Sequence, residues 1–117
     1  MNVPRSERIA DVLRQSLAEV IQHETRDPRI GFVTLTEVKL SPDLRFARVY
    51  VSRLGDEAEV DDAMGALNRA APFFRKALAG KTSLRFIPGL KFYRDTAVEK
   101  GRRVEELLRE IKEQEQE

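Results

Sequence analysis

Pro72 interrupts an apolar pattern of helical spacing that otherwise runs from residue 56 to residue 79. A proline is tolerated in the first turn of a helix, but inside a helix it removes a hydrogen bond and clashes with the preceding turn. The pattern therefore predicts two helices that meet at a kink formed by Ala70, Ala71 and Pro72. A single long helix across this part of the chain is excluded.

The ends of these two helices are predicted from residues that favour helix termini. Asp56 followed by Glu59 has the spacing of a capping box, with aspartate in place of the usual serine or threonine. The first helix is therefore expected to begin there. The second helix is expected to run over about residues 73–79 and to end at Gly80, because glycine is common just after a helix.

A helix and two strands are predicted before the kink. Residues 6–24 place apolar side chains at helical spacing, with charged residues on the opposite face. Residues 32–40 are rich in β-branched side chains, and residues 45–53 alternate between apolar and polar. Residues 41–44 between them have proline where a type I turn favours it, so the two strands are expected to form an antiparallel hairpin.

One more strand is predicted after the second central helix, over residues 84–93. Its apolar side chains alternate and share one face: Leu84, Phe86, Leu90 and Phe92. Pro88 cannot donate a hydrogen bond to a neighbouring strand, so this strand is expected at an edge of the sheet or to be bulged there. A helix is then predicted from Thr96 through Ile111, followed by a charged end.

Aromatic residues recur at helix or strand spacing, which favours core packing over base stacking. The residues expected in the core on this basis are Phe73, Phe74, Phe86 and Phe92. Tyr50 and Tyr93 fall on the opposite strand faces, where stacking on a base stays open as the less favoured alternative.

Positive charge is concentrated in one stretch of the chain. Residues 68–104 hold ten Lys/Arg against two Asp/Glu, a net charge of +8, whereas residues 1–67 carry −3 and residues 105–117 carry −4. The total of +1 conceals this asymmetry. A concentrated positive surface is typical of proteins that bind a phosphate-rich partner.

Several function classes are not supported by the composition. The chain has no cysteine, which excludes disulfides and thiolate metal sites. The longest apolar run, residues 70–74, is far too short for a membrane span, and the first residues lack the apolar run of a secretory signal. His23 is the only histidine, and no cluster of catalytic or metal-ligating residues is visible. A cytoplasmic monomer without enzyme activity, metal or cofactor is therefore expected.

The order of the predicted elements resembles the type II KH domain, an RNA-binding α+β fold with a three-stranded sheet. The expected KH-like domain covers residues 1–95, and a C-terminal helix with a charged tail covers residues 96–117. KH domains usually carry a GXXG loop at the break between two helices, where nucleotide backbone comes close. No two glycines of this chain are three apart, so a general KH reader of single strands is disfavoured.

Several segments together resemble one family of KH-like proteins, ribosome-binding factor A. They are residues 27–34, 37–45, 47–52, 66–70 and 92–95, together with Arg75. The resemblance extends over about residues 4–108. In that family the helix break carries an Ala-X-Gly kink, whereas the matching residues here are Ala70, Ala71 and Pro72. Proline keeps the kink but removes a backbone N–H and the conformational freedom of glycine.

The resemblance implies a bacterial assembly factor without a catalytic centre, associated with growth at low temperature. Such a protein binds the free 30S ribosomal subunit near its decoding region and assists late maturation of 16S ribosomal RNA. Other assembly factors or GTPases are possible further partners.

The residues expected to contact RNA are the cations that flank and follow the kink: Arg69, Arg75, Lys76, Lys81, Arg85 and Lys91. Lys100, Arg102 and Arg103 are better explained as a helix face that pairs with nearby glutamates. Two alternatives stay open. One is a protein–protein adaptor that docks another factor through its exposed sheet face or tail helix, and the other, disfavoured, is a nuclease.

Overall fold

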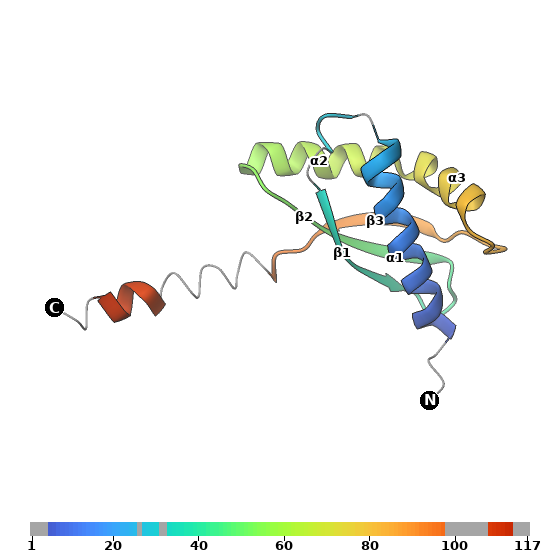
Figure 1. Cartoon of the computed structure of the whole chain (residues 1–117), viewed down its shortest axis with the longest axis horizontal. Coiled ribbons are helices and arrows are strands. Elements are labelled where there is room, and N and C mark those ends of the chain that lie inside the picture. The colour runs from blue at the N-terminus through green and yellow to red at the C-terminus, as the bar shows by residue number, and fades with distance from the viewer. Residues whose placement is uncertain (1–4, 26, 31–32, 98–107, 114–117) are drawn as a thin grey trace.

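Three helices and a three-stranded sheet make up the folded body of the chain (Figure 1). The computed structural model describes residues 5–25, 27–30, 33–97 and 108–113. Its elements are α1 (Arg5–Glu24), β1 (Val33–Leu40), β2 (Phe46–Arg53), α2 (Glu57–Arg69), α3 (Ala71–Lys81) and β3 (Gly89–Arg94). This order confirms the predicted α+β, KH-like arrangement. Residues 108–113 are also helical. The helix predicted from Thr96 has its first residues described, with Ala97 helical, whereas residues 98–107 lie outside the described residues.

The sheet has the order β1-β2-β3, with β1 and β2 antiparallel and β2 and β3 parallel. The hairpin is therefore confirmed, and β3 lies at an edge, as Pro88 predicted. In the hairpin loop the Leu44 N–H donates to the Ser41 carbonyl over 2.9 Å, and Leu44 has a φ of 62°. The parallel pairing of β3 is possible because α2 and α3 together carry the chain back across the sheet.

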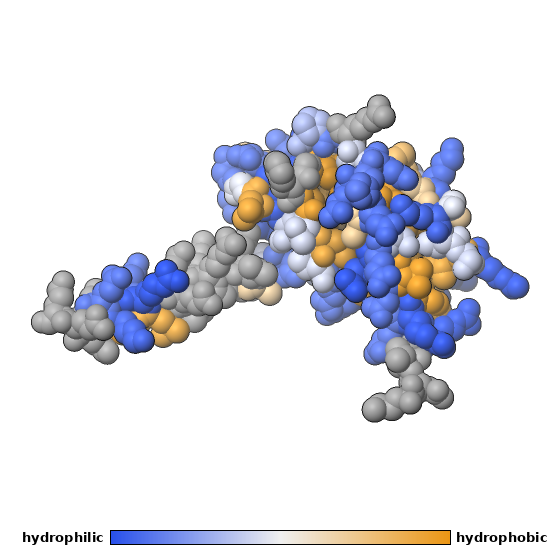
Figure 2. Space-filling model, viewed as in Figure 1, coloured by the Kyte–Doolittle hydropathy of each residue, from blue (hydrophilic) through white to orange (hydrophobic). Residues whose placement is uncertain are grey.

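The hydrophobic core lies between one face of the sheet and the three helices (Figure 1). Its members with no exposed surface are Leu17, Val20, Val49, Ala63, Leu67, Phe74 and Leu78. Phe74 of α3 meets Phe92 of β3 edge-on, with ring centroids 5.6 Å apart, and this contact ties α3 to the sheet. Figure 2, seen from the side of α1, shows hydrophilic residues over most of that helix's outer surface. No described helix has the length and apolar character that crossing a membrane requires.

The predicted start of α2 is confirmed, whereas the predicted end of α3 is wrong. Asp56 is the N-cap of α2, and its Oδ1 accepts the Glu59 N–H over 2.8 Å. Gly80 does not end α3, which continues to Lys81. Thr82 closes the helix instead, because its backbone N–H and its hydroxyl both donate to the Leu78 carbonyl over 2.9 Å. The Leu78 carbonyl in the last turn therefore has hydrogen-bond donors without a glycine in the left-handed conformation.

The last strand is shorter than predicted, because residues 84–88 are not part of the sheet and β3 begins only at Gly89. Pro88 has no N–H to give to a ladder, and the Ile87 carbonyl accepts a hydrogen bond from the Arg75 side chain over 3.0 Å. Ile87 points into the core with 8% exposure, whereas Phe86 is 57% exposed. The prediction that Phe86 packs in the core is therefore wrong.

The neighbouring phenylalanines of α3 also differ from each other. Phe74 is fully buried, as predicted, but Phe73 is 50% exposed, so the core prediction for Phe73 is wrong. Adjacent residues on a helix point about 100° apart, and the face of α3 that meets the core is centred on Phe74 and Leu78. Phe73 therefore stays half exposed, with an edge contact to the Phe74 ring at a centroid distance of 5.7 Å.

Candidate nucleic-acid interface

The corner between α2 and α3 is built around a single residue that serves both helices. Ala70 donates its N–H to the Ala66 carbonyl and accepts the Phe74 N–H with its own carbonyl, both over 3.0 Å. Its φ of −85° and ψ of 0° are right-handed values open to any L-residue. Pro72 lies in the first turn of α3, where its missing N–H would have no helical partner. The predicted kink is confirmed, and this bend needs no glycine.

Arg75 and Lys76 are the exposed cations of α3 nearest the corner. The Arg75 guanidinium uses Nη2 to hold the Ile87 carbonyl, which orients it beside the loop that precedes β3. Within the described part of the chain, neither residue has a carboxylate partner within ion-pair distance. A guanidinium held in place with its charge uncompensated is suited to binding a phosphate, since less side-chain freedom is lost on contact.

Lys76 and Lys81 line one hollow between α1 and α3. The hollow has a volume of about 580 Å³ and is lined by Glu24, Phe73, Lys76, Ala77, Gly80 and Lys81. Lys81 is not free there, because its Nζ lies 3.2 Å from a carboxylate oxygen of Glu19 on α1. The Glu19 side chain is 58% exposed, so the pair is well solvated and contributes little to stability. A phosphate could displace Glu19 from Lys81 at small cost.

Arg69 lies at the end of α2, apart from the hollow. Its guanidinium rests on the backbone of Gly65, since a Cβ atom at that glycine would be only 3.1 Å from Arg69 Nη1. Asp27 faces the same region, and the positive charge of Arg69 is one of the smaller causes that lower the Asp27 pKa. Arg69 and Lys76 are seven residues apart but belong to different helices, so the bend at Ala70 prevents them from sharing one helical face.

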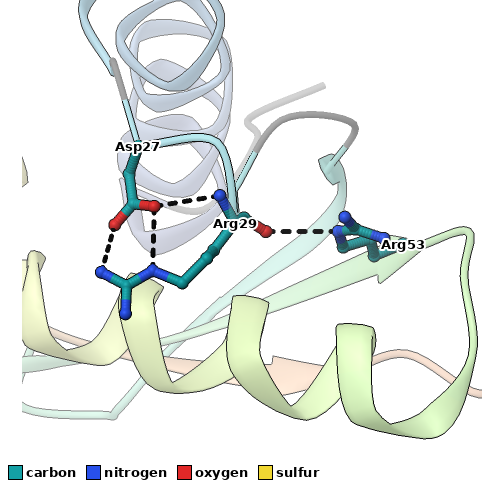
Figure 3. A network of polar contacts seen from close by, with 3 residues as sticks. All are labelled: Asp27, Arg29 and Arg53. Carbon is teal, nitrogen blue, oxygen red and sulfur yellow. Dashed lines mark hydrogen bonds and ion pairs between the residues drawn. The ribbon is translucent and has the colours of Figure 1, made fainter.

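Asp27, Arg29 and Arg53 form a polar network that holds residues 27–30 in place (Figure 3). The Asp27 carboxylate accepts the backbone N–H, Nε and Nη2 of Arg29 over 2.9, 3.0 and 2.7 Å, and Arg53 Nε donates to the Arg29 carbonyl over 3.3 Å. The side-chain hydrogen bonds from Arg29, followed by its backbone one, lower the pKa of Asp27 to about 2. Arg29 is thus engaged within the protein, and this polar segment is structural.

The remaining two predicted site residues lie elsewhere. Arg85 is exposed in the loop before β3, beside a hollow of about 290 Å³ that Arg5 and Phe86 also line. It is not on a strand, contrary to the expectation. Lys91 is exposed on β3 and lies on the face of the sheet opposite the helices. The structure therefore does not bring the six cations onto one surface: it separates Lys91 from the cations of α3.

Two further cations accompany Lys91, and the sequence-based set omitted both. Lys39 of β1 and Arg48 of β2 are exposed, and the register places Lys39 opposite Arg48 and Arg48 opposite Lys91. The alternation of β2 had indicated that Arg48 faces solvent. The parallel pairing with β3, which brings Lys91 alongside, has no local signal in the sequence. Within the described residues, no three His, Asp or Glu side chains gather closely enough to hold a metal ion.

Known proteins similar to this chain point to one family. The model of the family described as "Ribosome-binding factor A" matches residues 5–108. A ribosome-binding factor A from Desulfitobacterium hafniense is 44% identical over 112 residues, which cover 96% of this chain and 90% of that protein. These matches extend over the whole helical corner and all three strands.

Solved structures agree with this result. The crystal structure of ribosome-binding factor A from Thermus thermophilus matches with a TM-score of 0.71 and 34% identity, covering 79% of this chain and 97% of that one. A homology model of the Thermus thermophilus factor, fitted into the cryo-EM map of its complex with 30S, matches with a TM-score of 0.62 and 36% identity. That match covers 73% of this chain and 89% of the other.

Proposed function

This chain belongs to the ribosome-binding factor A family, and we propose that it binds free 30S ribosomal subunits and assists the late maturation of 16S ribosomal RNA. The observation that carries the proposal is the family match over residues 5–108, which contains every described element of the folded body. The likeness to a model fitted into a 30S complex supports the same partner.

We propose that the corner of α2 and α3 provides the main electrostatic contact with RNA. Arg75 and Lys76 are exposed and without a carboxylate partner among the described residues, and Arg69 lies just across the bend. Each phosphate that these cations neutralise releases condensed counterions, which favours binding without reading the base sequence. Lys81 and Arg85 would extend this surface along α3 and into the following loop.

The protein would act by holding ribosomal RNA in one conformation, and no catalytic step is part of the proposal. RNA helices that form in the wrong arrangement are long-lived, so a protein that binds the native arrangement more tightly shifts the population toward it. We further propose that the chain acts in the cytoplasm as a monomer, with the KH-like domain over residues 1–95 and a separate tail over residues 96–117.

Sedimentation of a cell lysate tests this function directly. In a sucrose gradient the protein is expected to co-migrate with free 30S subunits and to be absent from complete ribosomes. Ribonuclease or high salt should release it, because the contact is with RNA phosphates. Co-migration that survives both treatments would favour the adaptor alternative. Failure to co-migrate with 30S subunits in untreated lysate would contradict the proposal.

A further inference from the structure

The face of the sheet that the helices leave open carries an aromatic pair beside a row of cations. The register aligns Lys39, Arg48 and Lys91 across the three strands, and it aligns Glu37, Tyr50 and Tyr93 in the next outward row. Neighbouring strands are about 4.8 Å apart, so the side chains of each row lie next to one another. We infer that this face binds a single-stranded segment of RNA, with bases stacked on the two tyrosines and phosphates held by the three cations.

The tyrosines form a ready stacking platform. The rings of Tyr50 and Tyr93 are stacked with centroids 5.7 Å apart and planes inclined by 30°. The core contains its own aromatic pair, Phe74 and Phe92, on the other side of the sheet. Cross-strand aromatic pairs stabilise a sheet by themselves, so the rings alone would not identify a ligand. The positive charges next to the rings indicate which kind of ligand fits.

The three cations lie in the row next to the tyrosine pair, and the two lysines approach its rings. Lys39 Nζ lies 5.8 Å from the Tyr50 ring centroid, and Lys91 Nζ lies 5.5 Å from that of Tyr93. Arg48 lies between them on β2. Like charges directly opposite each other on neighbouring strands repel and destabilise a sheet. The row therefore has an unfavourable energy that an anionic partner would relieve.

Little within the described chain neutralises this row. Among the ion pairs of the described residues the row has one, between Lys39 and Glu37 at 3.9 Å, and Glu37 is half exposed. Arg48 and Lys91 have no ion pair among the described residues. The row thus keeps a clear positive charge next to two aromatic rings, the combination with which proteins bind unpaired nucleic acid strands.

A hollow at the β3 side of this face offers space for a base. It has a volume of about 690 Å³ and is lined by Phe46, Arg48, Asn68, Lys91 and Tyr93, among others. Phe46 is 64% exposed, and its ring lies across Gly89, where a Cβ atom would be 3.4 Å from Cδ1 of Phe46. Phe46 is thus a third accessible aromatic ring on the same face.

The charges favour RNA over a protein as the occupant. The centres of protein–protein interfaces are depleted in lysine, whereas this face carries two exposed lysines, one on β1 and one on β3. Addition of a peptide strand at β3 is also hindered, because Asn68 already occupies the backbone groups of Phe92. A single strand of RNA offers bases that can stack on the two tyrosines and phosphates that can neutralise the three cations.

This inference rests on the proposed function and adds a second RNA surface, on the side of the sheet away from α3. The test is fluorescence anisotropy of the full chain with a short oligouridylate, with an RNA duplex for comparison. Tyr50→Leu combined with Tyr93→Leu should weaken binding of the oligouridylate by about tenfold or more, because each stacked base contributes substantially. Tyr50→Phe with Tyr93→Phe keeps both rings and should retain the parent affinity.

Three outcomes would overturn the inference. They are unchanged binding by a folded double-leucine variant, equal loss in the double-phenylalanine variant, and tighter binding of the duplex than of the oligouridylate. If the leucine variant does not fold, ultraviolet cross-linking of a 4-thiouridine oligonucleotide to the parent protein provides an independent measurement. Cross-links are expected in peptides that contain β2 and β3, and their absence there would also overturn it.

The two proposals fail separately in one further comparison. Charge reversal at Arg75 and Lys76 should weaken association with 30S subunits while leaving oligouridylate binding largely intact. If oligouridylate binding proves independent of Tyr50 and Tyr93 while 30S association persists, the sheet inference is wrong and the proposed function stands. If 30S association is absent and the tyrosine-dependent binding remains, the proposed function is wrong and the sheet inference stands.

Discussion

The side-chain amide of Asn68 completes the backbone hydrogen bonding of Phe92 at the edge of the sheet. Asn68 Oδ1 accepts the Phe92 N–H over 2.9 Å, and Nδ2 donates to the Phe92 carbonyl over 3.2 Å. The N–H groups of Gly89 and Asp95 donate to the carbonyls of Arg45 and Val51 on the β2 side. The backbone groups of successive residues in a strand point in opposite directions, so those of Phe92 point away from the sheet. One residue of α2 thereby replaces a missing fourth strand at this position.

Asn68→Ala should lower the free energy of unfolding by about 1–3 kcal/mol, because both Phe92 backbone groups lose their partner in a partly buried place. Chemical denaturation measures the change. Asp61→Ala, an exposed position on the same helix, is the matched control and should change stability by less than about 0.5 kcal/mol. Equal stability of the two variants would show that water replaces the amide without loss.

Phe74→Ala should destabilise the fold by about 3–5 kcal/mol, because it removes a fully buried ring and its edge contact with Phe92. Phe73→Ala, one residue earlier, removes a ring that is 50% exposed and should cost far less. Thermal unfolding followed by circular dichroism distinguishes the two. A comparable loss in both variants would contradict the burial seen at α3.

Asp56→Ala should cost about 1 kcal/mol, because the Glu59 N–H at the start of α2 loses its acceptor. Asp56→Asn keeps an oxygen at the same place and should remain close to the parent protein. Urea unfolding of the three proteins gives the comparison. Loss of stability in Asp56→Asn equal to that in Asp56→Ala would mean that charge, and not the cap, matters at this position.

Stability should fall in acid partly through Asp27. Its hydrogen bonds from Arg29 lower its pKa from 3.8 to about 2 in the folded protein. A carboxylate with a lowered pKa contributes stability above its unfolded pKa, and this contribution is lost as the pH falls through the folded value. Asp27→Asn should therefore flatten the dependence of unfolding free energy on pH between about 4 and about 2. Asp61→Asn, the same change at an exposed position of α2, is the matched control.

Arg75→Glu combined with Lys76→Glu should weaken binding to purified 30S subunits by about tenfold or more at moderate salt. If the parent neutralises about four phosphates, its log K should fall against log salt with a slope near −3, and the variant slope should be shallower by about 1–2. The matched control is Arg8→Glu with Arg14→Glu, which makes the same change in net charge on exposed positions of α1. An equal loss in both variants would mean that binding depends on total charge and not on the corner.

Local signals predicted the elements of this fold well. Asp56 caps α2 as its spacing with Glu59 predicted, and Pro72 opens α3 as its chemistry required. The turn at Pro42 joins two antiparallel strands. Each of these features depends on residues within a few positions of one another, so neighbouring sequence carries the full physical reason. The division of the chain at residue 95 stays a prediction, because residues 98–107 lie outside the described part.

The errors had two sources: a residue distant in the chain decided the local structure, or a nearby residue did so in place of the predicted one. The alternation of residues 84–88 is typical of a strand, yet the Ile87 carbonyl is taken by Arg75 from α3. Gly80 has the chemistry of a helix end, yet Thr82 provides the hydrogen bonds that let α3 continue past it. Phe73 and Phe86 are apolar, but the core is filled by their neighbours Phe74 and Ile87.

The amino-acid sequence by itself determined the family, the kinds and order of the elements, and the concentration of positive charge after residue 67. The tertiary structure alone decided which cations lie together. Parallel pairing of β3 with β2 placed Lys91 beside Arg48 and Tyr93 beside Tyr50, on the far side of the sheet from α3. Strand register follows from the packing of residues far apart in the chain, and a shift by one residue would move each of these side chains to the opposite face.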